Sequence, residues 1–199
     1  MLSFYQKEKL ECGVDEAGRG CLAGPVVAAA VILPTDFWHA DIQDSKKISE
    51  SKRYILREVI IENAWAWNIG VASVEMIDEV NILNATYSAM NEAIKGLSVR
   101  PELLVVDGNR FQNESSIPHI CLVQGDSKNL NVAAASILAK TFRDDIMQWL
   151  HKEFPDYQWN RNKGYPTTFH RLMIQKLGLT PYHRKTFQCF PSLDLFSEL

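Results

Sequence analysis

The sequence lacks an apolar run long enough to cross a bilayer, and it contains no closely spaced cysteines. Its longest apolar stretch, Cys21–Pro34, is shorter than the roughly 20 residues that a spanning helix needs, and it contains a proline. The first residues, MLSFYQKEKLECG, have no apolar centre of the kind found in signal peptides. The four cysteines include no C-x-x-C pair, which argues against zinc and thiol-redox motifs and favours reduced thiols. We therefore expect a cytoplasmic protein that does not associate with membranes.

An excess of positive charge is also absent. The 199 residues carry 21 Lys and Arg against 24 Asp and Glu, a net charge of −3, which does not by itself indicate nucleic-acid binding. The charge is unevenly distributed, because residues 1–150 hold 14 basic and 20 acidic side chains whereas residues 151–199 hold 7 and 4. We expect the basic end to meet backbone phosphate, through Arg161, Lys163, Arg171, His183, Arg184 and Lys185. A core or hydrogen-bonded role is the commoner one for His183, with protonation of a leaving group as the alternative.

The remaining pattern is that of an ordinary folded domain, with 46% hydrophobic residues and no repeat or linker. Runs rich in β-branched residues predict strands at 11–16, 25–33, 64–74, 103–106 and 120–123, the first two forming a hairpin and the second buried on both faces. Helical spacing predicts helices from Ser49 onward, over 75–97, from 132 to about 152, and over 167–177 with Gly178 as the stop. Strands cluster first and helices alternate later, which predicts the α/β class with a mixed five-stranded sheet flanked by helices.

Four acids fall at or just after strand ends: Asp15 and Glu16 after the first strand, Asp107 after the fourth, and Asp126 after the fifth. A hard divalent cation such as Mg²⁺ or Mn²⁺ prefers oxygen ligands, so a few convergent carboxylates suffice to hold one or two ions. Two ions about 3.5–4 Å apart would clamp the attacking and leaving oxygens of a phosphoryl transfer. This placement predicts phosphodiester hydrolysis. Asp144 and Asp145 on the long helix compete with Asp126 as the fourth acid.

The stretch DEAGRG raises a geometric problem and also offers its answer. Adjacent residues of a regular strand point to opposite faces, so Asp15 and Glu16 need a bulge or bend to share one pocket, and Gly18 and Gly20 permit one. Glycine also lets backbone groups approach a ligand closely, and Arg19 brings a charged fork suited to phosphate. Backbone groups held that close can read a 2′-hydroxyl, which distinguishes RNA from DNA.

Several segments, in order and covering nearly the whole chain, resemble ribonuclease HII, the type 2 ribonuclease H family. They are GVDEAGRGCLAGPVVAAAVIL (13–33), DSKKIS (44–49), VVDGN (105–109), GDSKNLNVAAASILAKTFRD (125–144), GYPT (164–167) and PYHRKTF (181–187). Cys21 stands where the family often has proline or alanine. The sister type, ribonuclease HIII, lacks the GRG form and usually carries an extra N-terminal domain, and neither feature fits this sequence.

The resemblance implies a ribonuclease H-like fold in a single domain, 1–199, whose small helical C-terminal part (about 155–199) completes the substrate groove. It implies endonucleolytic cleavage of RNA in RNA–DNA hybrids, including single ribonucleotides in duplex DNA, with Mn²⁺ or Mg²⁺. It also implies a monomer, with a possible replication-clamp contact through the tail, Ser192–Leu199, for which a docked final helix is the alternative.

The resemblance also assigns roles residue by residue. Asp15, Glu16, Asp107 and Asp126 match the metal-binding acids; this alignment favours Asp126 over Asp144, which falls in an ordinary Arg-Asp pair. Gly18, Arg19 and Gly20 match the motif that recognises the 2′-hydroxyl, and Tyr165 matches the tyrosine that stacks on the following deoxyribose. Lys46, Lys47, Lys128 and Arg184 are expected to contact the substrate. Two other functions compete: a hybrid-binding protein without catalysis, which would gain nothing from four acids facing phosphate, and a junction resolvase or exonuclease, which would leave GRG and Tyr165 unexplained.

Overall fold

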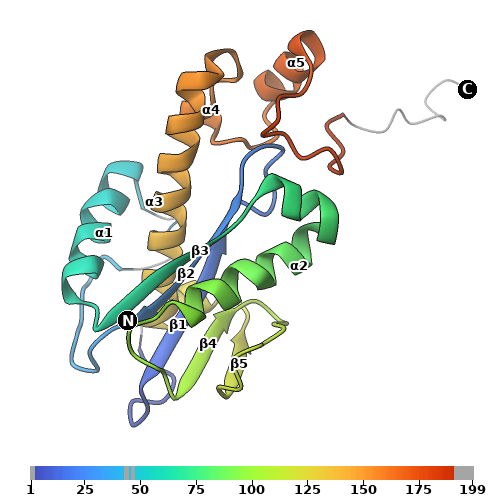
Figure 1. Cartoon of the computed structure of the whole chain (residues 1–199). Coiled ribbons are helices and arrows are strands. Elements are labelled where there is room, and N and C mark those ends of the chain that lie inside the picture. Colours follow the sequence, from blue (N-terminus) through green and yellow to red (C-terminus); the bar gives the residue numbers. More distant parts are fainter. Residues whose placement is uncertain (1–2, 43–44, 46–47, 191–199) are drawn as a thin grey trace, which may run out of the picture.

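The protein is built on one five-stranded mixed sheet (Figure 1). The computed structural model describes residues 3–42, 45 and 48–190. The strands are β1 (Glu11–Ala17), β2 (Val26–Ile32), β3 (Ala66–Ala72), β4 (Leu103–Asp107) and β5 (His119–Leu122), in the spatial order β3-β2-β1-β4-β5. The pairs β1–β2 and β2–β3 are antiparallel, whereas β1–β4 and β4–β5 are parallel. The expected mixed sheet and its opening hairpin are confirmed.

Helices cover both faces of the sheet. α2 (Val74–Lys95) packs on the face that carries Val14, Ala28 and Val106, while α1 (Glu50–Asn63) and α3 (Leu130–Glu153) lie on the other. Every residue of β2 is buried, because its side chains alternate between these two cores. The helix starts follow the expected capping chemistry, since the side chain of Ser49 accepts from the N–H of Lys52 at the start of α1.

α2 departs from the single continuous helix expected over 75–97. Asn81 has a left-handed φ of 70°, which kinks the helix into two segments. Its side-chain oxygen accepts the N–H groups of Leu83 and Asn84, so it restarts the helix as a cap would. Asparagine tolerates this backbone conformation better than most residues, which explains why the kink falls there.

The C-terminal part forms a separate, smaller core at the far end of α3 (Figure 1). It contains the 3₁₀ turn η3 (Pro155–Tyr157), α4 (Trp159–Asn162) and α5 (Thr168–Leu177). The rings of Tyr157 and Trp159 stack at 5.3 Å and pack with Leu22 and Ala23 from the loop after β1. This core therefore ties the C-terminal part to the loop that holds the Gly-Arg-Gly motif. Over the described residues, no helix is long and apolar enough to cross a membrane.

Candidate active site

Two of the four acids lie side by side at the carboxyl ends of parallel strands. The β1–β4 register pairs Val14 with Val106, so the next residues, Asp15 and Asp107, are neighbours across the two central strands. Open sheets of this kind bind ligands beyond the carboxyl ends of their parallel strands. The structure thus brings together two acids that are 92 residues apart in the sequence.

The surroundings of Asp15 disfavour the charged form of its carboxyl group. It is 4% exposed, and burial raises its pKa well above the usual value. The negative charges of Glu16 and Asp107 raise this pKa further, whereas a hydrogen bond from the side chain of Ser136 lowers it. The Oδ1 atom of Asp15 also accepts the N–H of Glu16 at 2.7 Å. A buried carboxyl beside two like charges is a site that a cation would stabilise.

The bulge expected in DEAGRG is not present in β1. The ladder with β2 runs without interruption from Gly13 opposite Val31 to Ala17 opposite Val27. The backbone turns only after both acids, at Gly18, whose φ is +101°. Glu16 nevertheless lies close enough to raise the pKa of Asp15, and its side chain forms an ion pair with Arg19 at 3.3 Å.

A single hydrogen bond couples Asp107 to the segment that carries the fourth acid. The Oδ1 atom of Asp107 accepts the N–H of Gly125 at 2.7 Å. Gly125 opens the 3₁₀ turn η2 (Gly125–Ser127), and the next residue, Asp126, is 5% exposed. The site is therefore assembled from β1, β4 and η2.

These acids fit a hard divalent cation by chemistry and charge. Within the described part of the chain, no three or more His, Cys, Asp or Glu side chains are drawn together tightly enough to enclose an ion by themselves. Mg²⁺ does not require such a cage, because it keeps several waters and is commonly held by one or two carboxylates together with substrate phosphates. The residues present therefore fit ions whose coordination is completed by water and substrate.

The Gly-Arg-Gly loop follows directly from the acids. Gly18 is buried against the side chain of Arg143, and a Cβ atom built on it would lie 2.0 Å from the Nε atom of Arg143. Gly20 is exposed, and a Cβ atom there would meet nothing within 4 Å. The structure accounts for glycine at position 18 by its backbone and its packing, whereas nothing among the described residues requires glycine at position 20.

Tyr165 is held beside this loop. The N–H of Leu22 donates to the carbonyl of Gly164 at 2.8 Å, which joins the loop after β1 to the residue before Tyr165. The ring is 40% exposed, with the Lys140 ammonium 5.7 Å from its centroid. The carbonyl of Tyr165 accepts from the Nδ1 atom of His170 at 3.0 Å, which fixes the backbone. The structure thus places the exposed Tyr165 close to the loop that carries the glycines.

The expected lysine contacts are placed in part. Lys128 is exposed near Asp126, and its ammonium donates to the carbonyl of Val123 at 2.7 Å. Lys46 and Lys47 lie outside the described residues. The carbonyls on either side of them, Ser45 and Ile48, both accept from Nη1 of Arg53, at 2.9 Å and 2.6 Å.

Arg184 is not the phosphate contact that the sequence led us to expect. Its side chain is 0% exposed and donates only to backbone carbonyls, including those of Gly18 and Arg19. His183 is equally buried, with Nδ1 accepting the N–H of Thr180 and Nε2 lying 3.1 Å from Nε2 of His170. His183 therefore has the core role, and its pKa is lowered to about 4 by burial and then by the charge of His170.

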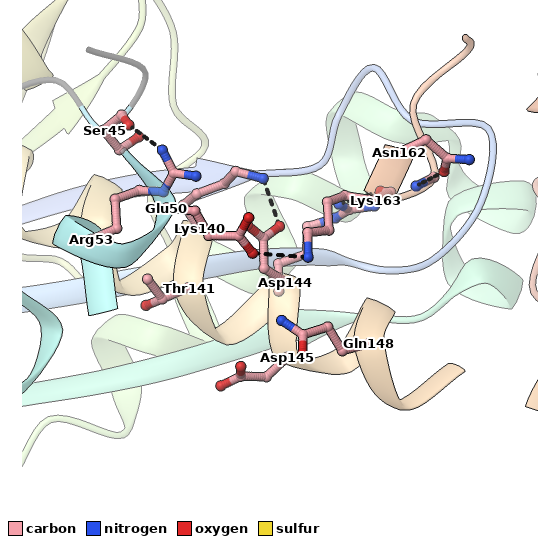
Figure 2. A network of polar contacts seen from close by, with 12 residues as sticks. Ser45, Glu50, Arg53, Lys140, Thr141, Asp144, Asp145, Gln148, Asn162 and Lys163 are labelled. Carbon is pink, nitrogen blue, oxygen red and sulfur yellow. Dashed lines mark hydrogen bonds and ion pairs between the residues drawn. The ribbon is translucent and has the colours of Figure 1, made fainter. Parts of the chain in front are cut away.

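The two competing acids on α3 are used in ion pairs, of which Figure 2 shows that of Asp144. Asp144 is 1% exposed and lies 2.6 Å from the ammonium of Lys140. Asp145 accepts from the hydroxyl of Tyr54 at 2.7 Å and pairs with Arg57. Lys163, expected to face phosphate, is buried and pairs with Glu50 at 3.1 Å. These contacts give both acids structural roles, and Asp126 as the fourth acid of the site stays a prediction.

The buried residues that support the site through hydrogen bonds could not be identified from the sequence. Ser136 bonds Asp15, and its hydroxyl lies 2.9 Å from that of Ser45. Arg143 is fully buried and donates to the carbonyls of Pro25, Ala23 and Lys163. A serine within an alanine-rich helix and an arginine beside an aspartate carry no sequence signal for these roles, since the contacts form only across the folded chain.

Solved structures establish the class of protein that this fold and site define. Ribonuclease H2 from Pyrococcus horikoshii matches with a TM-score of 0.76 at 23% identity over 90% of this chain and 94% of that one. The Archaeoglobus fulgidus RNase HII solved in complex with PCNA matches with a TM-score of 0.72 at 26% identity, over 90% of this chain and 95% of that one. Bst-RNase HIII in complex with Mn²⁺ matches with a TM-score of 0.68 at 19% identity, over 84% of this chain and 62% of that one. The chain has the ribonuclease H-like fold.

Sequence comparison gives the particular family. The family model for ribonuclease HII matches residues 12–190. The ribonuclease HII of Bacteroides thetaiotaomicron is 57% identical over 94% of both chains, and that of Phocaeicola vulgatus is 56% identical over 98% of both. The chain belongs to the ribonuclease HII family, and it is a metal-dependent endoribonuclease that acts on RNA–DNA hybrids.

Proposed function

We propose that this enzyme cleaves at single ribonucleotides embedded in duplex DNA as well as in longer hybrids, by two-metal-ion phosphodiester hydrolysis. The observation that carries the proposal is the open space at Gly20, four residues after Glu16, on the loop whose Leu22 N–H bonds the carbonyl of Gly164 next to the exposed Tyr165. A sugar-phosphate backbone can approach the main chain closely there. One ribose 2′-hydroxyl is the smallest feature that such a contact can read.

In this mechanism Asp15, Glu16, Asp107 and Asp126 supply the oxygen ligands. When bound, Mg²⁺ or Mn²⁺ activates the attacking water and stabilises the leaving oxygen. Manganese is supported by the Bst-RNase HIII complex with Mn²⁺. The hydrogen bond from Ser136 to Asp15 and that from Gly125 to Asp107 hold the two central carboxylates in place before substrate arrives.

Tyr165 and the exposed basic residues position the nucleic acid. The ring of Tyr165 stacks on the deoxyribose that follows the ribonucleotide. Lys128 and, by their motif, Lys46 and Lys47 contact backbone phosphates, and the C-terminal part (about 155–199) completes the groove within a single domain. This division separates residues that read the sugar from residues that bind any duplex.

The test compares duplex DNA containing one ribonucleotide with an all-DNA duplex of the same sequence. We expect cutting of the first alone, at the ribonucleotide, with Mg²⁺ or Mn²⁺ and none in excess EDTA. Raising the salt concentration should lower the rate, because phosphate contacts release counterions. Binding without cutting would support the non-catalytic alternative, and cutting of the all-DNA duplex would indicate a nuclease of another type.

We also propose that the C-terminal residues Ser192–Leu199 contact a replication clamp. The support is the solved complex of the Archaeoglobus fulgidus RNase HII with PCNA. These residues lie outside the described part of the chain. Co-purification of the clamp with the full chain and its loss on deletion of Ser192–Leu199, with unchanged hybrid cleavage, are the expected results; clamp binding that survives the deletion would contradict the assignment.

A further inference from the structure

Arg184 forms hydrogen bonds to the Gly-Arg-Gly loop from inside the protein. Its Nη2 atom donates to the carbonyl of Gly18 at 2.7 Å, and Nη1 donates to that of Arg19 at 2.8 Å. Nε and Nη2 also reach the carbonyl of Gly24, at 3.0 Å and 2.8 Å. One planar guanidinium therefore joins the two ends of the loop that connects β1 to β2. Only arginine offers donors in such a fixed fork.

These contacts determine which way the peptide units of the loop face. The C=O and N–H groups of one trans peptide unit point in opposite directions. Because the carbonyls of Gly18 and Arg19 point inward at Arg184, the N–H groups of Arg19 and Gly20 point away from it. Arg19 and Gly20 are exposed, and the side of Gly20 is open space. Two main-chain donors thus face the place where substrate would lie.

The carbonyls of Gly18, Arg19 and Gly24 account for a buried cation here. Removing a guanidinium from water is costly, but an apolar residue of similar size would leave these carbonyls without donors. Burial lowers the pKa of Arg184 to about 10, so the group stays charged at neutral pH. The charge strengthens its hydrogen bonds to the carbonyls, which favours one fixed orientation of the loop.

We propose that Arg184 is the positioning residue for ribonucleotide recognition, turning the N–H groups of Arg19 and Gly20 outward so that they donate to the 2′-hydroxyl and its neighbouring phosphate. The inference rests on the proposed function, and it adds the residue that orients the recognising backbone. Arg184 does not touch the substrate. It acts on selectivity through the loop.

The test is Arg184→Lys, which keeps the charge but cannot bridge the same carbonyls. The matched control is Arg57→Lys, because the side chain of Arg57 is mostly buried, pairs with Asp145 and lies over the ring of Phe142, and none of its described contacts involves the Gly-Arg-Gly loop. For each enzyme, KM is measured on a one-ribonucleotide duplex, and Ki is measured for an all-DNA duplex of the same sequence as competitor. Loss of folded protein lowers the apparent kcat but changes neither constant.

We expect the KM of Arg184→Lys to rise at least tenfold and approach its Ki for the all-DNA duplex. That Ki should stay within about twofold of the Ki of the unaltered enzyme. Arg57→Lys should keep the ratio of Ki to KM within about threefold. An unchanged ratio in Arg184→Lys, or an equal loss in both variants, overturns the proposal. If the unaltered enzyme does not cut the one-ribonucleotide duplex, the proposed function fails; if it cuts that duplex but shows KM equal to Ki, only the recognition of the 2′-hydroxyl through this loop fails, so the two failures are distinguishable.

Amide hydrogen exchange of the unaltered enzyme provides a second measurement that does not depend on the variants folding. The N–H groups of Leu22 and Gly24 donate to the carbonyls of Gly164 and Tyr182, so they should be protected. Those of Arg19 and Gly20 should exchange at least a hundredfold faster in the free enzyme. Equal protection of all four amides would show that the donors face inward and would overturn the proposal.

Discussion

The substitution Gly20→Ala should affect the stability of the fold and the cleavage of substrate in opposite directions. A methyl group at this position meets nothing within 4 Å, and the φ of Gly20 is not in the left-handed region. The fold should therefore accept alanine, and the loss of unfolded-state freedom should raise the free energy of unfolding by about 0.4–1 kcal/mol. In a domain of this size, that corresponds to an increase in Tm of roughly 1–4 °C.

Activity should respond in the opposite direction. The added methyl group occupies the space through which the ribose and its phosphate reach the main chain, and a displacement of about 1 Å in a reacting group can cost 10²-fold in rate. We expect kcat/KM on a one-ribonucleotide duplex to fall by about 100-fold. The assay is steady-state cleavage of that duplex, with thermal unfolding measured on the same preparation.

Gly18→Ala is the matched comparison, because it introduces the same atom two residues earlier. Here the φ of +101° disfavours alanine, and the new Cβ would lie 2.0 Å from Nε of Arg143, whose guanidinium is fixed by three carbonyls. Backbone strain and overpacking each cost about 1–3 kcal/mol, so we expect destabilisation of roughly 2–6 kcal/mol. Near-normal cleavage by Gly20→Ala, or destabilisation equal to that of Gly18→Ala, would refute the reasoning.

Three further predictions concern single side chains. Asp107→Asn should nearly abolish cleavage at saturating Mg²⁺ without lowering Tm, because it removes a ligand charge and its repulsion of Asp15 while keeping an oxygen for the N–H of Gly125; retained activity or a lower Tm would contradict the metal-ligand role. Tyr165→Ala should slow cleavage of a one-ribonucleotide duplex more than cleavage of a long hybrid, with Tyr165→Phe milder, and equal losses on both substrates would argue for packing alone. His183 has a folded pKa of about 4, below its unfolded value near 6.5, so it favours folding at pH 7 and this contribution is lost as pH falls from 6.5 toward 4. Urea unfolding at pH 7 and pH 4.5 should show His183→Gln losing about 2–3 kcal/mol less than the unaltered chain, and parallel losses would refute that assignment.

The local sequence determined most of the strands and helices and pointed to the candidate acids. β2 is predictable because a run of β-branched and small residues buried on both faces has few other uses, and the starts of α1 and α5 are predictable because Ser49 and Thr167 cap them. The acids could be placed at or just after the strand ends because Asp107 directly follows an apolar run and Asp126 follows another after two residues. These signals depend on neighbours in the chain, so they can be read without a fold.

Tertiary structure decided what depends on distant partners. It determined that the β1 ladder runs regularly through both acids, that Ser136 supports Asp15, and that Asn81 kinks α2. Arg184 shows the difference most clearly, because its place in a basic segment of the sequence predicts a surface contact with phosphate. Only the fold brings the carbonyls of Gly18 and Arg19 around it from more than 160 residues away, and their hydrogen bonds make a buried guanidinium stable.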